Sequence, residues 1–506
     1  PTRDGIIEFE FADLEKMHFL KLDILGLSNL SFIRKIEDKI LSHCKTLPLV
    51  DDEHLDDKLA FDVLSIGNTL GIFQLESSGM KDAIKKVNPN CFDDLVALIA
   101  LYRPGPIDNI STYALNKKNP DQIKHYTKEI DDVLKSTNNI IIYQEQIMAI
   151  VKNYAGLSSS VADSFRKAIA KKDSEKMEKY KEIFYESAKE KGKDIKEIEE
   201  IYKLIEKFAL YGFNKAHSVS YAIIGYKIAY LKVHYPLVFI CEMLNNSIGN
   251  KQKIKKEIDE AKVLNINVLK PSINLSTSYY EVKDNNILSP FSIIKDIGVL
   301  SSNRIVNERC DNGTYKSYID FVKRNYKLGK DVIRNIILSG ALDEFGYNKK
   351  TLIENMDLVI DYADISSDLD DSSITEPELD IKDEYEDDFL TKSELDIYGY
   401  YISNHPTNRY INDNSITTKV LDKYFDRNIK IALYFERKRE ITTKNNEKMM
   451  FIEASDSFGR IDVVLFPKTY QRYFNISFSK VYMVTGRVEK RFSKMQIVAS
   501  LINEVD

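Results

Sequence analysis

The stretch from residue 208 to residue 244 constrains the fold of this chain more than any other. Its second part, residues 219–244, is almost continuously apolar. The interruptions in it are few: Lys227, Lys232, His234 and Pro236. Because a membrane-spanning helix needs about 20 residues with almost no charge, the segment predicts a pair of buried helices instead.

A short connector rich in polar residues precedes this apolar segment. Phe208, Tyr211 and Phe213 recur at near-helical spacing, the pattern breaks at Gly212, and four polar side chains follow: Asn214, Lys215, His217 and Ser218. Polar side chains are costly to bury unless they are hydrogen-bonded, so such a connector lies at a cleft more often than in a core. A helix-ending turn whose Lys and His are merely solvated is the alternative that the residues leave open.

Length and charge bound the class of protein. A chain of 506 residues predicts about three to four domains. The formal charge of −6 conceals a basic body, because residues 361–388 hold thirteen Asp or Glu and one Lys, and the rest of the chain has 71 basic and 65 acidic residues. This balance is compatible with a polyanionic partner. The four cysteines lie far apart without metal-ligand spacing, which predicts free thiols and a cytoplasmic protein.

The sequence FALYGFNKAHSVSYAIIGYKIAYLKVHYP, residues 208–236, resembles the fingers-domain signature of the bacterial DNA polymerase III alpha subunit, the C family of replicative DNA polymerases. The resemblance implies template-directed DNA synthesis from deoxynucleoside triphosphates with two Mg²⁺ ions. It also implies an alpha subunit without a built-in proofreading exonuclease, because an OB fold is expected after the fingers.

The resemblance covers nearly the whole chain and implies a multidomain fold. We expect mainly α-helical fingers and helix-hairpin-helix (clamp-binding) domains, a partial α+β palm, and a C-terminal all-β OB-fold barrel. The expected boundaries are 1–45 for the end of the palm, 46–246 for the fingers, 247–360 for the clamp-binding domain, 361–394 for an acidic disordered linker, 395–426 for a connector and 427–506 for the OB fold. Five strands with a short helix after the third are expected in the last.

The segment LKLDILGL, residues 20–27, is similar to the strand that carries the third catalytic carboxylate of the family, and Asp23 takes that position. The resemblance makes Asp23 a catalytic residue and a metal ligand. From the residues alone, an Asp that caps the next helix or pairs with Lys21 fits as well. No acidic motif matches the other two carboxylates of the family. We therefore expect a fragment that begins inside the palm and does not polymerise alone.

The residues expected to bind the nucleotide lie on three segments that resemble the fingers. Arg103 is fixed at a loop edge by the sequence RPGP. Within residues 141–172 we expect two helices joined at 156–160, the second of which carries Arg166, Lys167, Lys171 and Lys172. The family usually has paired Arg where this chain has Arg166 and Lys167, and Lys lacks the bidentate fork. A solvated basic face is the ordinary alternative. Asn214, Lys215, His217 and Ser218 complete the expected pocket.

Two further segments are candidates for binding DNA. Residues 292–324 resemble a helix-hairpin-helix, in which Lys295 and Gly298 would meet a phosphate, although Asp296 stands where the usual hairpin has Gly and a packing role fits as well. In the OB fold, Arg437, Lys438 and Arg439, with Tyr434, Phe435 and Phe451, are candidates for a stacking and phosphate-contacting surface. An ordinary barrel core with basic edge strands is equally consistent.

The partners expected from the resemblance are primer–template DNA, deoxynucleoside triphosphates, the sliding clamp and other replisome subunits, with no membrane. No Gln lies between Gln252 and Gln471, so the clamp-docking peptide typical of the family cannot be placed. The alternative function is a non-catalytic scaffold that binds single-stranded or duplex DNA.

Overall fold

The computed structural model describes residues 2–3, 5–20, 22, 26–44, 54–171, 174–209, 212–367, 375–402, 405–412, 414–443, 446–491 and 494–505. The predicted site residues Asp23 and Lys172 lie outside the described residues. Residues 21 and 23–25 of the predicted strand at 20–27 also lie outside them. Of Lys171 only the backbone, at the end of a helix, is described.

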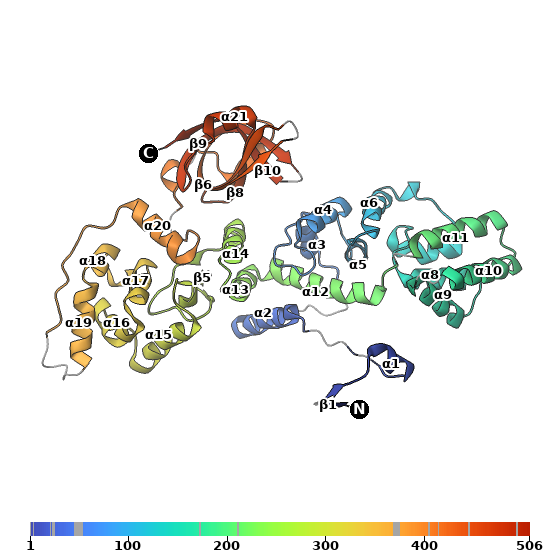
Figure 1. Ribbon diagram of the computed structural model, residues 1–506, viewed down its shortest axis with the longest axis horizontal. Coiled ribbons are helices and arrows are strands. Elements are labelled where there is room, and N and C mark those ends of the chain that lie inside the picture. The colour runs from blue at the N-terminus through green and yellow to red at the C-terminus, as the bar shows by residue number, and fades with distance from the viewer. Residues whose placement is uncertain are drawn as a thin grey trace.

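The chain forms an elongated row of helices with a separate barrel beside it (Figure 1). Its first part contains β1 (Thr2–Arg3), β2 (Ile6–Ile7), α1 (Phe11–Lys16) and α2 (Ser28–Cys44). The helices that follow are α3 (Lys58–Ser65), α4 (Ser78–Val87), α5 (Phe92–Leu101), α6 (Asn109–Lys118), α7 (Lys128–Leu134), α8 (Gln144–Asn153), α9 (Ser159–Lys171), α10 (Ser174–Glu190), α11 (Ile195–Ala209), α12 (Lys215–His234) and α13 (Pro236–Asn246).

A second group of helices lies at the other end of the row (Figure 1). It contains α14 (Lys251–Val263), β3 (Val268–Leu269), β4 (Glu281–Lys283), β5 (Asn286–Leu288), α15 (Val299–Asn312), α16 (Tyr318–Asn325), α17 (Lys330–Leu338), α18 (Lys349–Glu354), α19 (Met356–Ser367) and α20 (Asp387–Tyr398). The three short strands form one sheet in the order β3-β5-β4.

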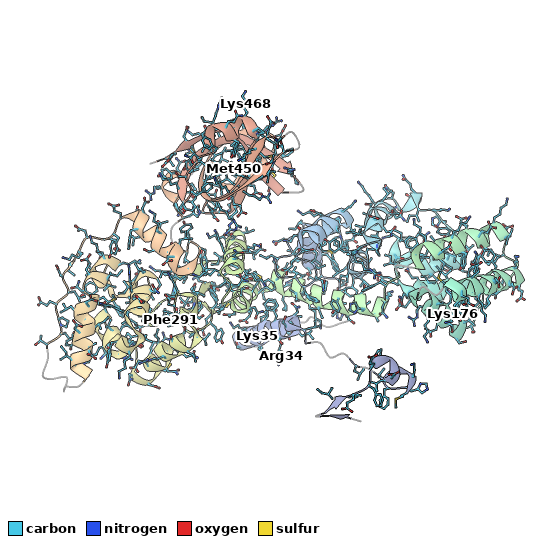
Figure 2. The ribbon with its side chains drawn as sticks, viewed as in Figure 1. Arg34, Lys35, Lys176, Phe291, Met450 and Lys468 are labelled. Carbon is cyan, nitrogen blue, oxygen red and sulfur yellow. The ribbon has the colours of Figure 1, made fainter. Side chains whose placement is uncertain are left out.

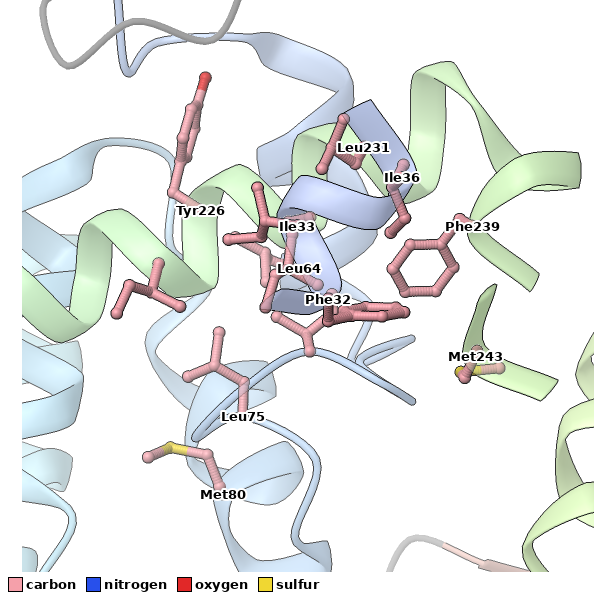
Figure 3. Packing of buried hydrophobic residues seen from close by; sticks show 14 of the residues in the cluster. Phe32, Ile33, Ile36, Leu64, Leu75, Met80, Tyr226, Leu231, Phe239 and Met243 are labelled. Atoms are coloured by element: carbon pink, nitrogen blue, oxygen red, sulfur yellow. The ribbon is translucent and has the colours of Figure 1, made fainter. Parts of the chain in front are cut away.

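The helix pair predicted at residues 219–244 is α12 and α13, and it forms the axis of the helical body. Both helices are largely buried, and Pro236 ends one and starts the other. Helix α2 packs on both: Phe32 meets Phe239 edge to face with ring centres 5.5 Å apart, and Ile33 and Ile36 belong to the same buried cluster as Leu231 (Figure 3). Helix α2, within the range predicted as the end of the palm, thus shares the core of the helices that follow it.

The two helices predicted within residues 141–172 are confirmed for the described residues. They are α8 and α9, joined across 154–158. Helix α11 packs through an apolar stripe on which Ile198, Ile201 and Ile205 are buried.

The prediction of a disordered linker at 361–394 is wrong for the residues that the structure describes. Helix α19 covers the start of that range and α20 its end, and residues 375–386 run extended between them. Asn355 accepts from the backbone N–H of Asp380 (2.9 Å) and donates to its carbonyl (2.9 Å). This acidic segment has few apolar residues, but it is ordered because neighbouring side chains form hydrogen bonds with its backbone N–H and carbonyl groups.

The C-terminal part is a closed five-stranded barrel in the order β10-β8-β7-β6-β9, as expected for an OB fold. Its elements are β6 (Asn428–Thr442), β7 (Lys448–Ser455), β8 (Arg460–Leu465), α21 (Pro467–Tyr473), β9 (Lys480–Arg491) and β10 (Lys494–Glu504). The short helix follows the third strand, as predicted. Met450 and Phe435 are fully buried inside the barrel, so Phe435 belongs to its core and not to a stacking surface (Figure 2).

Among the described residues no helix is both long enough and apolar enough to cross a membrane. Cys91, Cys241 and Cys310 are free thiols.

Candidate nucleotide-binding face

An isolated parallel β-bridge between Tyr143 and Phe213 joins two segments that are far apart in the sequence. The N–H of Phe213 donates to the carbonyl of Ile142 (3.0 Å), and the N–H of Gln144 donates to the carbonyl of Phe213 (2.9 Å). The side chain of Gln144 also donates to the carbonyl of Gly212 (3.1 Å). The residues that lead into α8 therefore hold the residues that lead into α12.

Arg103 lies in the turn after α5, against this bridge. Its Nε donates to the carbonyl of Ala100 (2.9 Å), and its guanidinium carbon lies 4.3 Å from the centre of the Phe213 ring. Burial lowers the pKa of Arg103 from its ordinary value, yet an Arg remains charged at neutral pH. The ring and the carbonyl fix a cation at the loop edge, where the sequence predicted one.

Arg166 reaches the same bridge from α9. Its Nη1 donates to the side-chain oxygen of Gln144 (3.4 Å), and its Nε and Nη2 donate to one carboxylate oxygen of Asp163 (3.1 and 2.8 Å). Lys167 pairs with the other oxygen of Asp163 (2.8 Å) but is more exposed than Arg166. The hydrogen bonds from Lys167 and Arg166 lower the pKa of Asp163, which stays ionised.

The polar residues predicted on a connector belong instead to the first turn of α12. Asn214 caps this helix, since its side-chain oxygen accepts from the N–H of His217 (2.9 Å). The N–H of Lys215 donates to both carboxylate oxygens of Glu145 (3.1 and 3.0 Å), and its ammonium lies 5.5 Å from the centre of the Tyr143 ring. The cap and the Glu145 contact fix the orientation of this turn.

Aromatic rings continue from the bridge along α12 in one column. The ring centres of Phe213 and His217 lie 5.3 Å apart, those of His217 and Tyr221 4.3 Å, and those of Tyr221 and Phe73 5.2 Å. His217 is exposed. We define Arg103, Arg166, Phe213, Lys215 and His217 as the candidate nucleotide-binding face.

Ser218, which the sequence grouped with these residues, lies elsewhere. Its side chain is fully buried, and its hydroxyl has no hydrogen-bond partner among the described residues. Successive side chains on a helix point in different directions, so Ser218 faces the interior although its neighbour His217 is exposed.

The two residues predicted to bind DNA in the helical hairpin have different surroundings. Lys295 donates to both carboxylate oxygens of Asp396 on α20 (3.0 and 2.8 Å). Gly298 begins α15 without a side-chain cap and with open space around it. Asp296 adopts a left-handed backbone conformation (φ 64°) and accepts from Asn335 (3.1 Å). The carboxylate of Asp296 is thus used in packing.

The three cations predicted on the barrel lie on β6. Arg437 pairs with Glu453 (2.6 Å), Lys438 pairs with Glu440 (2.9 Å), and the guanidinium of Arg439 lies 5.2 Å from the ring centre of Phe451. A cavity of about 440 Å³ has Arg437, Lys438, Arg439 and Phe451 in its wall, together with Glu453 and Asp462. We call these four residues the barrel face.

Carboxylates for a metal centre are not assembled in the part of the chain that the structure describes, where no three His, Cys, Asp or Glu side chains converge. The described residues therefore do not fit a two-metal site on their own.

Sequence reasoning missed the residues that hold the face together. Gln144, Glu145 and Asp163 are ordinary polar residues in helical patterns, and their partners lie on other helices. Gln144 and Glu145 stand at the start of α8, where the buried run of residues 140–143 ends. That boundary is the signal that marks them as residues at a surface edge.

Three parts of the chain match models of known protein families. Residues 29–192 match the family model described as the bacterial DNA polymerase III alpha subunit finger domain. Residues 265–352 match the helix-hairpin-helix motif, and residues 435–505 match the OB-fold nucleic acid binding domain.

Curated relatives match along the whole chain. It is 38% identical over 510 residues to the DNA polymerase III subunit alpha of Staphylococcus epidermidis strain RP62A, which covers 99% of this chain and 48% of that protein. It is 34% identical over 507 residues to the protein of the same name from Staphylococcus aureus strain MSSA476, covering 99% of this chain and 47% of that protein. The chain thus spans about half the length of the curated relatives it matches.

Among solved structures, the second OB-fold domain of replication protein A from Methanococcus maripaludis aligns with 16% of this chain and 87% of that domain. The identity is 18%, and a TM-score of 0.14 carries no argument.

Proposed function

Since the chain belongs to the family of the bacterial DNA polymerase III alpha subunit, we propose that it is the nucleotide-binding and DNA-handling part of a replicative DNA polymerase. The parent protein extends a primer with deoxynucleoside triphosphates on a DNA template, in the cytoplasm of a bacterium. This chain contributes the grip on the incoming nucleotide.

The convergence of Arg103, Arg166 and Lys215 on the Tyr143–Phe213 bridge is the observation that carries the proposal. An incoming triphosphate brings several negative charges, and cations fixed in advance bind it without reorganisation during the reaction. Arg166 can offer a planar fork to a phosphate, so it is the principal phosphate contact. Lys167 adds positive charge next to it, and Lys171 and Lys172 remain candidates from the sequence.

The ring column accounts for the other end of the nucleotide. His217 and Tyr221 present aromatic faces on the first two turns of α12, and base-sized rings stack on such faces with modest sequence preference. Asn214 fixes the start of this helix, which keeps the exposed His217 next to the bridge. The nascent base pair would lie against these residues while its triphosphate meets the cations.

Two Mg²⁺ ions would activate the primer 3′ hydroxyl and stabilise the leaving pyrophosphate in the parent protein. Asp23 is the ligand that this chain would supply, and the remaining carboxylates would come from outside it. The described residues of this chain bind and orient the nucleotide.

The helical hairpin at Lys295 and Gly298 and the barrel face are proposed to contact DNA. The match of residues 265–352 to a helix-hairpin-helix motif and of residues 435–505 to a nucleic acid binding OB fold supports this. Lys295 is paired with Asp396, whereas Arg439 on the barrel face makes no ion pair among the described residues, so the barrel face is the stronger of the two candidates. Binding to the sliding clamp and to other replisome subunits is proposed from the family alone.

Replacing Asp23 in the parent protein separates a polymerase from a non-catalytic DNA-binding scaffold. For a polymerase, Asp23→Ala abolishes primer extension while the Kd for primer–template DNA is unchanged. Asp13→Ala is a matched control, because Asp13 is exposed on α1 and pairs only with Lys16 three residues away among the described residues. Primer extension that survives Asp23→Ala would refute the metal-ligand role of Asp23.

A further inference from the structure

A pocket of about 320 Å³ lies between α14, the C-terminal end of α20 and barrel strand β6. Five cations and a single carboxylate are among the described residues in its wall: Lys251, Lys255, Lys256, Arg437, Arg460 and Glu436. None of them belongs to the candidate nucleotide-binding face. Like charges that converge on one cavity repel each other, so the wall favours an anionic occupant.

The carboxylate in this wall is already engaged. Glu436 accepts from the ammonium of Lys255 (2.8 and 2.9 Å) and from the hydroxyl of Ser455 (2.6 Å), and Arg460 lies 3.9 Å away. These contacts lower the pKa of Glu436 in spite of its burial. Burial lowers the pKa of Lys255, and the charge of Arg460 lowers it further. Glu436 therefore does not neutralise the rest of the wall.

Two cations in the wall make no ion pair among the described residues. Lys256 is exposed at the mouth, and Lys251 donates to the carbonyl of Ile397 (3.2 Å) at the end of α20. The stem of Lys251 crosses Gly399, whose φ is 81° and where a Cβ would come within 2.8 Å of Lys251 Cδ. The backbone thus holds this cation in place and leaves its charge uncompensated.

The pocket is continuous with the barrel face. Arg437 and Arg460 also stand in the wall of a second cavity of about 550 Å³, which Asp422, Glu453 and Asp462 line as well. Arg437 is in turn part of the barrel face. A phosphate in the pocket would therefore lie at one end of a path along which bases can stack on Phe451.

We propose that the pocket between α14 and β6 is a phosphate-binding site outside the nucleotide-binding face. Its phosphate comes either from the backbone of a single strand that leaves the barrel face or from a free polyphosphate such as pyrophosphate. Only the strand-bound form rests on the proposed binding of DNA by the barrel.

Two titrations of the full chain test the site. Inorganic pyrophosphate is titrated by calorimetry, and a fluorescent oligothymidylate by anisotropy, each with the wild type, Lys256→Ala and the matched control Lys253→Ala. Lys253 is exposed on the same helix and is not in the wall of the pocket. Removing one charge-assisted contact of about 1 kcal/mol should weaken binding about fivefold in Lys256→Ala, with no change in Lys253→Ala.

The outcome also identifies the source of the phosphate. A loss for the oligothymidylate alone assigns the pocket to a strand, a loss for pyrophosphate alone assigns it to a free anion, and a loss for both shows that either is accepted. The proposal is overturned if Lys256→Ala and Lys253→Ala bind both probes alike. In that case a loss of oligothymidylate binding in Arg439→Ala would show that DNA binding by the barrel still stands.

Discussion

The guanidinium carbon of Arg103 lies 4.3 Å from the centre of the Phe213 ring, and this contact joins the turn after α5 to the residue before the cap of α12. The two residues are brought together by the β-bridge at Tyr143. Because the ring attracts the cation and limits its rotamers, the position of Arg103 depends on the residue at 213.

Replacing Phe213 by Leu should therefore weaken nucleotide binding without unfolding the protein. Leu keeps apolar volume but offers no negative ring face, and a contact of about 1 kcal/mol corresponds to an increase of about fivefold in the KM for the nucleotide. Phe213→Tyr retains the ring and serves as the control in single-nucleotide incorporation by the parent protein. Equal KM values for the two variants would contradict the role of the ring.

The buried carboxyl of Glu257 on α14 should make stability depend on pH. Burial raises its pKa to about 7, one oxygen accepts from the hydroxyl of Ser247 (2.6 Å), and the other has no partner among the described residues. Between the ordinary pKa and about 7 the folded chain binds more protons than the unfolded chain, so the free energy of unfolding falls as pH rises. Above pH 7 the free energy of unfolding is lower by up to ~3 kcal/mol than it is below the ordinary pKa of a Glu.

Glu257→Gln removes this titration and keeps the acceptor for Ser247. The free energy of unfolding of the helical body is measured with denaturant at mildly acid and at mildly alkaline pH. It should fall less between the two pH values in the variant than in the wild type. A loss of the same size in both proteins would mean that Glu257 is not the group responsible.

The barrel depends on a glycine in β9. Gly486 pairs with Ala499 of β10, and a Cβ at Gly486 would clash with the carbonyl oxygen of Val498. Gly486→Ala should lower the free energy of unfolding of the barrel by about 1–3 kcal/mol, because strand backbones must move apart. Gly298→Ala is the control, since Gly298 has open space and an ordinary φ of −85° and should change stability by less than about 0.5 kcal/mol. Equal unfolding midpoints in chemical denaturation would refute the close approach.

Binding of single-stranded DNA to the barrel face should depend on salt. The logarithm of the binding constant falls as the logarithm of the salt concentration rises. Removing one phosphate contact in Arg439→Ala should make this slope less steep by about 1. Lys468→Ala is the control, because Lys468 lies on α21 and outside the barrel face (Figure 2). An unchanged slope in Arg439→Ala, measured by fluorescence anisotropy, would remove Arg439 from the DNA-binding surface.

The parts of the fold that follow local patterns were predictable from the sequence. The apolar length of residues 219–244 predicted α12 and α13, and the spacing of short apolar strands and turns predicted the barrel. Such local patterns of apolar residues can be read without knowledge of the partners of an element.

The parts that depend on distant partners were not predictable. Glu145 and Lys215 are 70 residues apart, and only the β-bridge beside them places one on the other. The residues after Gly212 were expected on a connector, but Asn214 caps a helix there by accepting from His217. Residues 375–386 were expected to be disordered because they have few apolar residues. Their order comes from Asn355 and other side chains on the helices beneath them.

The central claim is that the cations on the Tyr143–Phe213 bridge bind the triphosphate of the incoming nucleotide. Single-turnover incorporation by the parent protein on a primer–template measures the Kd for the nucleotide directly. We expect Arg166→Ala to raise this Kd about tenfold or more, the equivalent of at least ~1.4 kcal/mol. The Kd for primer–template DNA should stay unchanged, and so should both constants in the control Lys176→Ala, at an exposed position on α10 (Figure 2). A nucleotide Kd that is the same in Arg166→Ala as in the wild type would contradict the claim.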